Sequence, residues 1–146
     1  MINCFDGEFS FLSNFHPSVI TDGNKWFPTV EHYFQAAKTE TMEEYEAIAA
    51  ALTPGQAKRL GRHATLRIDW EEVKDQVMLD ALRKKFEIPG LRKKLLATGD
   101  EELIEGNTWH DNTWGNCSCN RCKNTEGQNK LGKLLMQVRE EIRHSV

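Results

Sequence analysis

The sequence predicts an α+β fold that is mainly α-helical, with a small β portion near the N-terminus. Helix-capping residues precede most of the segments in which apolar side chains recur at helical spacing. A hairpin signal lies within the first thirty residues. No internal repeat, low-complexity tract or Pro/Ser-rich linker divides the 146 residues. We therefore expect one compact domain over residues 1–146, which is a usual length for a single domain.

Two regions are expected to lack long helices. The first thirty residues are irregular or extended in pattern, apart from a hairpin whose strands are residues 19–21 and 25–27. These strands flank Asp22-Gly23-Asn24, and glycine accepts the positive φ that a tight hairpin turn requires. Residues 103–127, which are rich in Trp, Asn, Gly and Cys, are expected to form a loop.

Cap and stop signals predict the helices between these regions and after them. Thr29, Thr41 and Thr53 are the expected caps of the first three helices, and Asp69 is the expected cap of the fourth. Gly61 is expected to end the third helix, which has proline at its first position. The expected helices cover about residues 29–38, 41–52, 53–61, 69–86, 89–99 and 131–142.

Composition excludes several classes of protein. The chain has 39% hydrophobic and 28% charged residues, which is typical of a globular protein and not of a disordered one. The net charge of −3 argues against a protein that coats duplex nucleic acid, where many phosphates must be neutralised. The longest apolar run, residues 47–52, is far too short to span a membrane, so no membrane partner is expected. No signal peptide is visible, and the cytoplasm is the expected location.

The predicted helix over residues 29–38 separates two kinds of side chain. Apolar residues gather on one side, while Glu31, Gln35 and Lys38 gather on another. One interpretation is an amphipathic surface helix with solvated polar residues, whose charge pairs stabilise little. The other is a carboxylate and an amine that face a pocket, where they act as a proton-transfer group and a nucleophile. Spacing alone does not choose between the two.

Several motifs in this chain resemble those of one protein family. Residues 26–38, Trp-Phe-Pro-Thr-Val-Glu-His-Tyr-Phe-Gln-Ala-Ala-Lys, are similar to the signature of the NADAR (YbiA-like) family. The resemblance continues in order along nearly the whole chain. Further matching segments are residues 11–15, 61–62, 67–70, 98–100, 111–115 and 127–136.

The resemblance implies a YbiA-like fold and an N-glycosidase activity. The implied reaction is hydrolysis of the bond between ribose and a nitrogenous group in a phosphorylated N-riboside. One branch of the family acts on ribosylamino-pyrimidine intermediates of riboflavin synthesis, and another removes ADP-ribose from modified guanine, so an ADP-ribosylated nucleic acid is a candidate partner. No cofactor is required for such catalysis. A non-catalytic module that binds ADP-ribose or a nucleotide is the alternative, and a small zinc-stabilised interaction protein is a third.

The resemblance also implies catalytic residues, namely Glu31, Lys38 and Asp111. Cleavage of an N-glycosidic bond builds positive charge at the anomeric carbon, and the leaving nitrogen needs a proton. We assign proton transfer to Glu31 and a nucleophilic or electrostatic role to Lys38. Asp111 is expected to accept a hydrogen bond from a ribose hydroxyl. A nucleophilic Lys38 needs a lowered pKa, since an exposed lysine stays charged at neutral pH.

Four further residues are candidate substrate contacts. Trp70 and Trp114 offer flat rings on which a base can stack, although tryptophan is also a common core residue. Stacking is favoured for Trp70, and both interpretations stay open for Trp114. Asn14 is a candidate hydrogen-bonding partner of sugar or base, or a structural turn residue. Arg62 is a candidate phosphate ligand, because arginine binds phosphate with two parallel hydrogen bonds.

A cluster of three cysteines lies in the predicted loop. Cys117, Cys119 and Cys122 are closely spaced, and without a secretory signal such a set indicates metal ligands or free thiols. A structural zinc needs four ligands, so a fourth has to come from His110, Cys4 or another side chain. Free thiols are slightly favoured over zinc, because the usual arrangement of two paired Cys-x-x-Cys motifs is absent.

Overall fold

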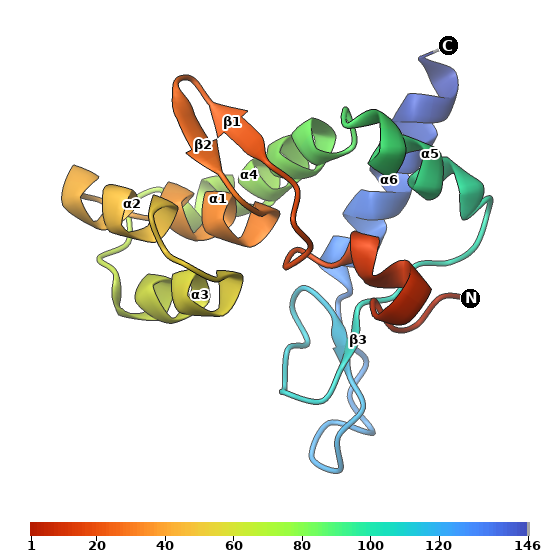
Figure 1. The fold of residues 1–146 in the computed structure, drawn as a ribbon. Coiled ribbons are helices and arrows are strands. Elements are labelled where there is room, and N and C mark those ends of the chain that lie inside the picture. Colours follow the sequence, from red (N-terminus) through yellow and green to blue (C-terminus); the bar gives the residue numbers. More distant parts are fainter. Residues whose placement is uncertain (146) are drawn as a thin grey trace. The chain divides into compact units, whose positions relative to one another are not determined.

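The computed structural model describes residues 1–145 and divides them into two compact units. The central unit comprises residues 14–88, and the terminal unit comprises residues 1–13 together with the chain from Pro89 onward. Figure 1 shows the elements of both units in sequence colours. The predicted α+β class with mainly helical content is confirmed. No helix within residues 1–145 is both long and apolar enough to cross a membrane.

The central unit begins with the predicted hairpin. β1 (Ile20–Asp22) pairs antiparallel with β2 (Lys25–Phe27), with Ile20 opposite Phe27. Gly23 has a φ of +59°, as the tight turn requires. The first strand begins one residue later than predicted. Figure 1 shows this hairpin beside the first two helices of the unit, and β2 contacts both.

The first helix of the unit, α1 (Val30–Ala37), is enclosed by its neighbours. Thr29 caps it as predicted, because its hydroxyl accepts the N–H of His32 at 3.1 Å. α1 contacts three other helices, and every residue from 30 to 36 is buried. Glu31 and Gln35, which lie on the polar side of the helix, are only 7% and 6% exposed. The interpretation as an amphipathic surface helix is therefore wrong, because its polar side is covered as well as its apolar side.

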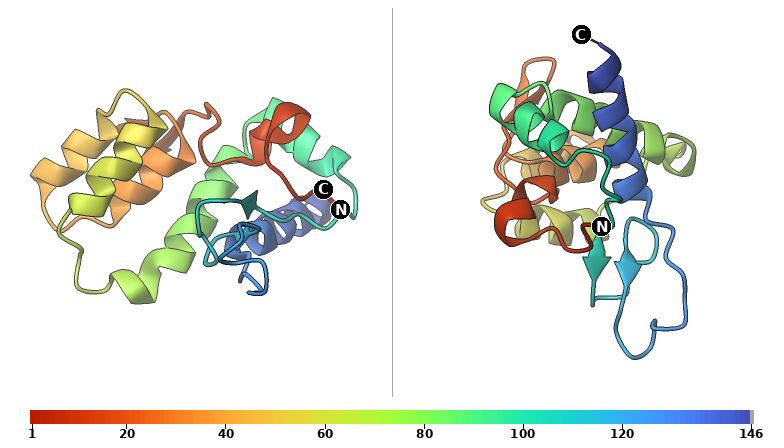
Figure 2. Two further views of the ribbon diagram at one scale, coloured as in Figure 1. Left: turned by 90° about the horizontal axis from the view of Figure 1, so that it is seen from below. Right: turned by 90° about the vertical axis from the view of Figure 1, so that its right-hand side faces the viewer.

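Two short helices pack on α1. α2 (Met42–Ala49) is capped by Thr41, whose hydroxyl accepts the N–H of Glu44 at 3.2 Å. α2 ends three residues earlier than predicted. α3 (Pro54–His63) is capped by Thr53 as expected. The left view of Figure 2 shows α1, α2 and α3 side by side, in agreement with their contacts.

The predicted role of Gly61 as the end of α3 is wrong. The helix continues to His63, and Gly61 is buried within it. A Cβ atom at this position would lie 1.9 Å from Oε1 of Gln35 and 3.2 Å from its Cβ atom. Glycine lets α3 approach the side chain of Gln35 on α1 this closely, because any Cβ atom here would force that side chain to move.

The last helix of the central unit is α4 (Trp70–Lys85). It begins where predicted, but the expected side-chain cap is absent. The carboxylate of Asp69 instead pairs with the guanidinium of Arg67, at 2.5 and 2.9 Å. A bidentate ion pair two residues away competes with capping for the same oxygens. The helix start therefore depends on backbone bonds to the carbonyl of Asp69, from the N–H groups of Glu72 and Val73.

The terminal unit is built on two helices, α5 (Pro89–Ala97) and α6 (Lys130–His144), which contact one another. A short 3₁₀ helix, η1 (Gly7–Leu12), contacts α5. Gly99, just after α5, has the positive φ of +64° expected at a helix end. The buried side chains of the unit include Phe11, Leu12, Leu91, Leu95, Leu103, Leu131, Leu135 and Val138.

The predicted loop over residues 103–127 contains a small sheet. β3 (Gly106–Asn107) and β4 (Asn116–Cys117) pair in parallel, and the right view of Figure 2 shows the two strands side by side. The loop joins α6 at Asn129, which has a left-handed φ of +49°. The amide of Asn129 donates to the carbonyl of Leu103 and accepts the N–H of Glu105, at 2.9 and 3.0 Å. This residue therefore ties the start of α6 to the segment before β3.

Candidate functional site

Glu31 is a buried carboxylate in the first turn of α1. Its Oε1 accepts a hydrogen bond of 2.8 Å from Nε2 of Gln35, four residues further along the helix. Its backbone N–H donates to the carbonyl of Asn14 at 3.1 Å. A short segment before the hairpin thus satisfies one of the free N–H groups at the helix start. The side chain is held in place by Gln35 and shielded from bulk water.

Lys38 lies at the C-cap of α1, seven residues after Glu31 and on the same side of the helix. Its Nζ lies 5.7 Å from the ring centre of Phe34 and 6.0 Å from that of Trp70. Burial lowers the pKa of Lys38, and the positive charges of Arg62 and Lys58 lower it further, against the opposing effect of Glu31. A larger fraction of this amine is therefore neutral at a given pH than for an ordinary lysine.

Arg62 and Lys58, both on α3, place positive charge near Lys38. Both influence its pKa, and Arg62 has the larger effect. Arg62 is exposed, and its guanidinium pairs with no carboxylate among residues 1–145. Nζ of Lys58 lies 5.9 Å from the ring centre of Phe15. An exposed guanidinium beside two ammonium groups is a suitable setting for a phosphate.

The ring of Trp70 forms an aromatic pair with Phe34. Their ring centres are 5.0 Å apart, with the planes tilted by 60°. Trp70 is only 6% exposed, so most of its ring faces protein. In this position the ring shields the amine of Lys38, whereas its predicted stacking on a base stays a prediction.

Asn14 lies in the segment that leads to the hairpin. Its amide nitrogen lies 3.7 Å from the sulfur of Met78, and its Oδ1 is buried without a hydrogen-bond donor among residues 1–145. Oε1 of Gln35 is also buried without a hydrogen-bond donor among these residues. Since a buried acceptor without a donor is costly, these two oxygens are polar atoms that the described residues leave unsatisfied.

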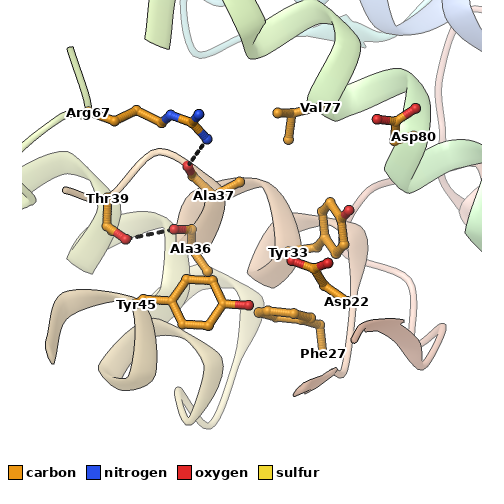
Figure 3. A pocket seen from close by; sticks show the side chains of 10 residues that line it. All are labelled: Asp22, Phe27, Tyr33, Ala36, Ala37, Thr39, Tyr45, Arg67, Val77 and Asp80. Atoms are coloured by element: carbon orange, nitrogen blue, oxygen red, sulfur yellow. Dashed lines mark hydrogen bonds between the residues drawn. The ribbon is translucent and has the colours of Figure 1, made fainter. Parts of the chain in front are cut away.

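A hollow of the central unit lies elsewhere on α1 and is lined by none of the predicted site residues (Figure 3). Tyr33, Tyr45, Asp22 and Asp80 lie around it. Burial, with help from the charge of Asp22, raises the pKa of Tyr45 to about 12, and burial also raises the pKa of Tyr33. Both hydroxyl groups stay protonated. The lining also includes Arg67, but its guanidinium is paired with Asp69, so the two carboxylates disfavour a phosphorylated ligand here.

Asp111 and Trp114 belong to the terminal unit, where they share one turn. Oδ1 of Asp111 accepts the N–H groups of Thr113 and Trp114, at 3.1 and 2.9 Å. Oδ2 of Asp111 accepts no hydrogen bond from residues 1–145, so it is open to a hydroxyl donor. Nζ of Lys130 lies 5.7 Å from the ring centre of Trp114. Their predicted roles toward substrate stay predictions.

The three cysteines of the predicted loop come together in the terminal unit with His110. Cys4, the other candidate fourth ligand, is an exposed thiol outside the group. The sequence thus located the cluster but left open which side chain completes it.

Three neighbours of the candidate site carried no role in the sequence prediction. Gln35 holds Glu31, Phe34 lies against Lys38 and Trp70, and Lys58 adds positive charge. The spacing of four residues between Glu31 and Gln35 was a usable signal, because such pairs face each other on a helix. Phe34 and Lys58 had no such signal, since their positions depend on how the helices pack.

Comparison with known proteins identifies the family of the chain. Residues 4–143 match the NADAR domain, a stretch that includes residues of both units. The chain is similar to an N-glycosidase of Nostoc punctiforme, with 45% identity over 139 residues that cover 91% of this chain and 85% of that protein. It is also similar to a riboflavin biosynthesis protein of Vibrio vulnificus, with 38% identity over 94% of this chain but only 36% of that protein.

A solved relative confirms the fold. The N-glycosidase YbiA of Escherichia coli is 41% identical over 138 residues, covering 92% of this chain and 82% of that protein. Its NMR structure matches with a TM-score of 0.81 and 39% identity, over 99% of this chain and 88% of that one. The match runs through the segments of Glu31, Lys38 and Asp111. By sequence and by fold, the chain belongs to the NADAR domain family.

Proposed function

We propose that this chain hydrolyses the bond between ribose and a nitrogen atom in a phosphorylated N-riboside, with Glu31 and Lys38 as the catalytic pair. The chain is an enzyme of the N-glycosidase type, as its similarity to proteins of that name over most of its length indicates. One observation carries the proposed mechanism. A buried carboxylate and an amine of lowered pKa lie on one side of the same helix.

The proposed steps use these two groups in turn. The neutral amine of Lys38 attacks C1′ of the ribose, and the C1′–N bond breaks as the leaving nitrogen takes a proton through Glu31. The sugar ring opens, and the amine of Lys38 holds C1′ as an imine. Water then adds to the imine, the C1′–Nζ bond breaks, and the sugar leaves as its free aldehyde. The net reaction consumes one water molecule and releases the base and a ribose phosphate.

Positive charge near Lys38 supports a phosphorylated substrate. Arg62 is exposed and unpaired in the described chain, and its fork geometry suits phosphate oxygens. Its charge also helps to hold the pKa of Lys38 below the usual range. The same guanidinium therefore serves binding and the preparation of the nucleophile.

Two substrate classes fit this chemistry, and we favour the first. A ribosylamino-pyrimidine phosphate is supported by the printed name of the Vibrio vulnificus relative, a riboflavin biosynthesis protein. Guanine that carries ADP-ribose, free or within a nucleic acid, offers the same bond type with a second phosphate. We further propose that Oδ2 of Asp111 accepts a hydrogen bond from a ribose hydroxyl. Within residues 1–145 this oxygen accepts no hydrogen bond.

A substrate panel tests the proposed function. The purified chain is incubated with a ribosylamino-pyrimidine phosphate and, separately, with ADP-ribosylated guanosine, and the released base and sugar are measured. We expect free base and ribose phosphate from the first compound, and an increased KM for Asp111→Asn by about 10–100-fold. Bound but unchanged ligand in both incubations would contradict the proposal and support a binding module instead.

A further inference from the structure

We propose that His110, Cys117, Cys119 and Cys122 bind one structural Zn²⁺ ion in the terminal unit. The ligand atoms of the four side chains all lie within 4.8 Å of one another. Four donors are the number that a closed, tetrahedral zinc site requires. Three residues contribute sulfur and one contributes an imidazole nitrogen, which is a common donor set of structural zinc sites.

The spacing of these atoms matches a zinc site. Nδ1 of His110 lies 3.2 Å from Sγ of Cys119 and 3.5 Å from Sγ of Cys122. A tetrahedron with Zn–S bonds of about 2.3 Å and a Zn–N bond of about 2.0 Å places its ligand atoms roughly 3.5–3.8 Å apart. Only small movements of the side chains are therefore needed to enclose the ion. Nδ1 is the nitrogen that faces the sulfur atoms and would bind the metal.

The backbone around the cluster is arranged as in a thiolate site. The N–H groups of His110 and Cys119 both point to Sγ of Cys117, at 3.3 and 3.5 Å. Such donors stabilise negative charge on sulfur and orient the ligand. His110 also has a left-handed φ of +69°, which is uncommon for a residue other than glycine. In this conformation Nδ1 of the imidazole ring lies beside the thiols of Cys119 and Cys122.

The donor set excludes several other occupants. It contains no oxygen atom, so the hard cations Mg²⁺ and Ca²⁺ are disfavoured. Because four protein ligands leave no open coordination position, the site is structural and not catalytic. None of the cysteines within residues 1–145 forms a disulfide. The proposal is independent of the N-glycosidase reaction, since none of the four ligands takes part in it.

The site would tie together a loop with little apolar content. Cys117 lies in β4, and its backbone N–H donates to Oδ1 of Asn112 at 2.9 Å. His110 directly precedes Asp111, whose side chain organises the turn to Trp114. A bound ion therefore links β4 to the turn of Asp111 and to the exposed segment around Cys122. Small loops of this kind depend on metal binding for their folding free energy.

Metal content of the full chain tests the proposal. The protein is purified in reducing buffer, incubated with Zn²⁺, freed from loosely bound metal by gel filtration, and analysed for zinc per chain. We expect about one zinc per chain in the wild type, as four ligands for one ion require. Cys119→Ser should lose most of this zinc. Cys4→Ser is the matched control, because Cys4 lies outside the cluster and should not change the content.

Two further measurements keep the test valid if a variant folds poorly. His110→Cys supplies a fourth thiolate and should retain zinc. Substitution of the wild-type protein with Co²⁺ should give the intense near-ultraviolet thiolate bands and the visible bands of tetrahedral cobalt. Wild-type protein that holds far less than one zinc per chain and shows no such cobalt spectrum would overturn the proposal. Equal zinc content in wild type and Cys119→Ser would overturn it as well.

Discussion

Glu31 and Lys38 depend on different neighbours for their proposed chemistry. A hydrogen bond of 2.8 Å from Gln35 holds the carboxylate, and the backbone of Asn14 holds the helix turn on which it lies. Burial and two positive charges act on the amine. A carboxylate held in place and an amine made partly neutral are both needed for attack on C1′ with proton transfer to the leaving group.

The pH dependence of the reaction should reflect the neutral form of Lys38. Burial disfavours the charged ammonium group, and this lowers the pKa of Lys38 from its usual value of 10.5. The rate of base release should therefore rise with pH through this lowered pKa and level off before the pH at which an ordinary lysine titrates. Lys38→Arg should lose base release over the whole pH range, since arginine stays charged and supplies no neutral amine for the attack. The measurement is kcat as a function of pH.

Chemical trapping gives a second measurement on the same residue. Borohydride added during turnover should reduce the imine and attach the sugar to the peptide that contains Lys38. Lys93→Met, at an exposed position on α5, should trap as much as the wild type. Lys38→Met should trap none. Equal trapping in Lys38→Met would mean that another amine is the nucleophile.

His32 has a structural role that makes stability depend on pH. Its ring is buried, with Nδ1 at 2.8 Å from Oγ1 of Thr29 and Nε2 at 3.0 Å from the carbonyl of Ala51. The carbonyl can only accept, so Nε2 carries the proton and Nδ1 accepts from the hydroxyl. Burial lowers the pKa of His32, despite the opposing effect of the bond to Ala51. The folded protein therefore keeps this ring neutral.

The free energy of unfolding should fall as the pH drops below about 6.5, where a histidine in the unfolded chain takes up a proton. The loss should continue until the pH reaches the lower pKa of the folded state. Above that range the contribution of the neutral ring is fully present. Urea unfolding at several pH values checks this, and His32→Gln should show a smaller slope over the range. An unchanged slope in the variant would assign the pH dependence to other groups.

At the level of the elements, local signals located the helices better than their ends. The hydroxyls of Thr29, Thr41 and Thr53 cap as predicted, because a cap depends on residues within one turn. Asp69 does not cap, since Arg67 takes its carboxylate. Gly61 was expected to end a helix, but its position is set by a neighbouring helix that the local sequence does not reveal.

The contact between α3 and α1 should be sensitive to one methyl group. Gly61→Ala introduces a Cβ atom 1.9 Å from Oε1 of Gln35, so the Gln35 side chain must move. We expect a loss of about 1–3 kcal/mol in the free energy of unfolding, as for other overpacked sites. Base release should fall as well, because Gln35 holds Glu31. Chemical unfolding and turnover are both measured.

Gly55→Ala is the matched control for this prediction. Gly55 is an exposed glycine of the same helix, and its new Cβ atom would lie 3.9 Å from the nearest atom, Oγ1 of Thr53. Stability should stay equal or increase by up to about 1 kcal/mol, since alanine favours a helix over glycine. If Gly61→Ala were as stable as Gly55→Ala, the close approach of α3 to Gln35 would be refuted.

At the scale of the whole molecule, the sequence could not predict which elements pack against one another. The two sides of α1 have different polarity, yet both are buried, because several helices enclose it. Periodicity reports polarity and not what covers a side. β3 and β4 were missed because each has two residues, too few for an alternating pattern. The catalytic candidates were found through family motifs, and their burial and neighbours were found only in the structure.

The NADAR match covers residues 4–143 and so includes residues of both units. The proposal therefore has to be tested on the intact protein. Glu31→Gln is the sharpest change, because glutamine keeps the size of the buried side chain but carries no transferable proton. Glu43→Gln, an exposed position on α2, is the matched control and should release base at the wild-type rate. A melting temperature near that of the wild type shows that Glu31→Gln is folded.

The most direct measurement is the rate of base release from a ribosylamino-pyrimidine phosphate by the intact wild type, Glu31→Gln and Glu43→Gln. Loss of proton transfer to the leaving nitrogen should lower kcat of Glu31→Gln by about 10²–10⁴-fold, with a smaller change in KM. Turnover of folded Glu31→Gln close to that of the wild type would contradict the assignment of Glu31 as the proton-transfer group.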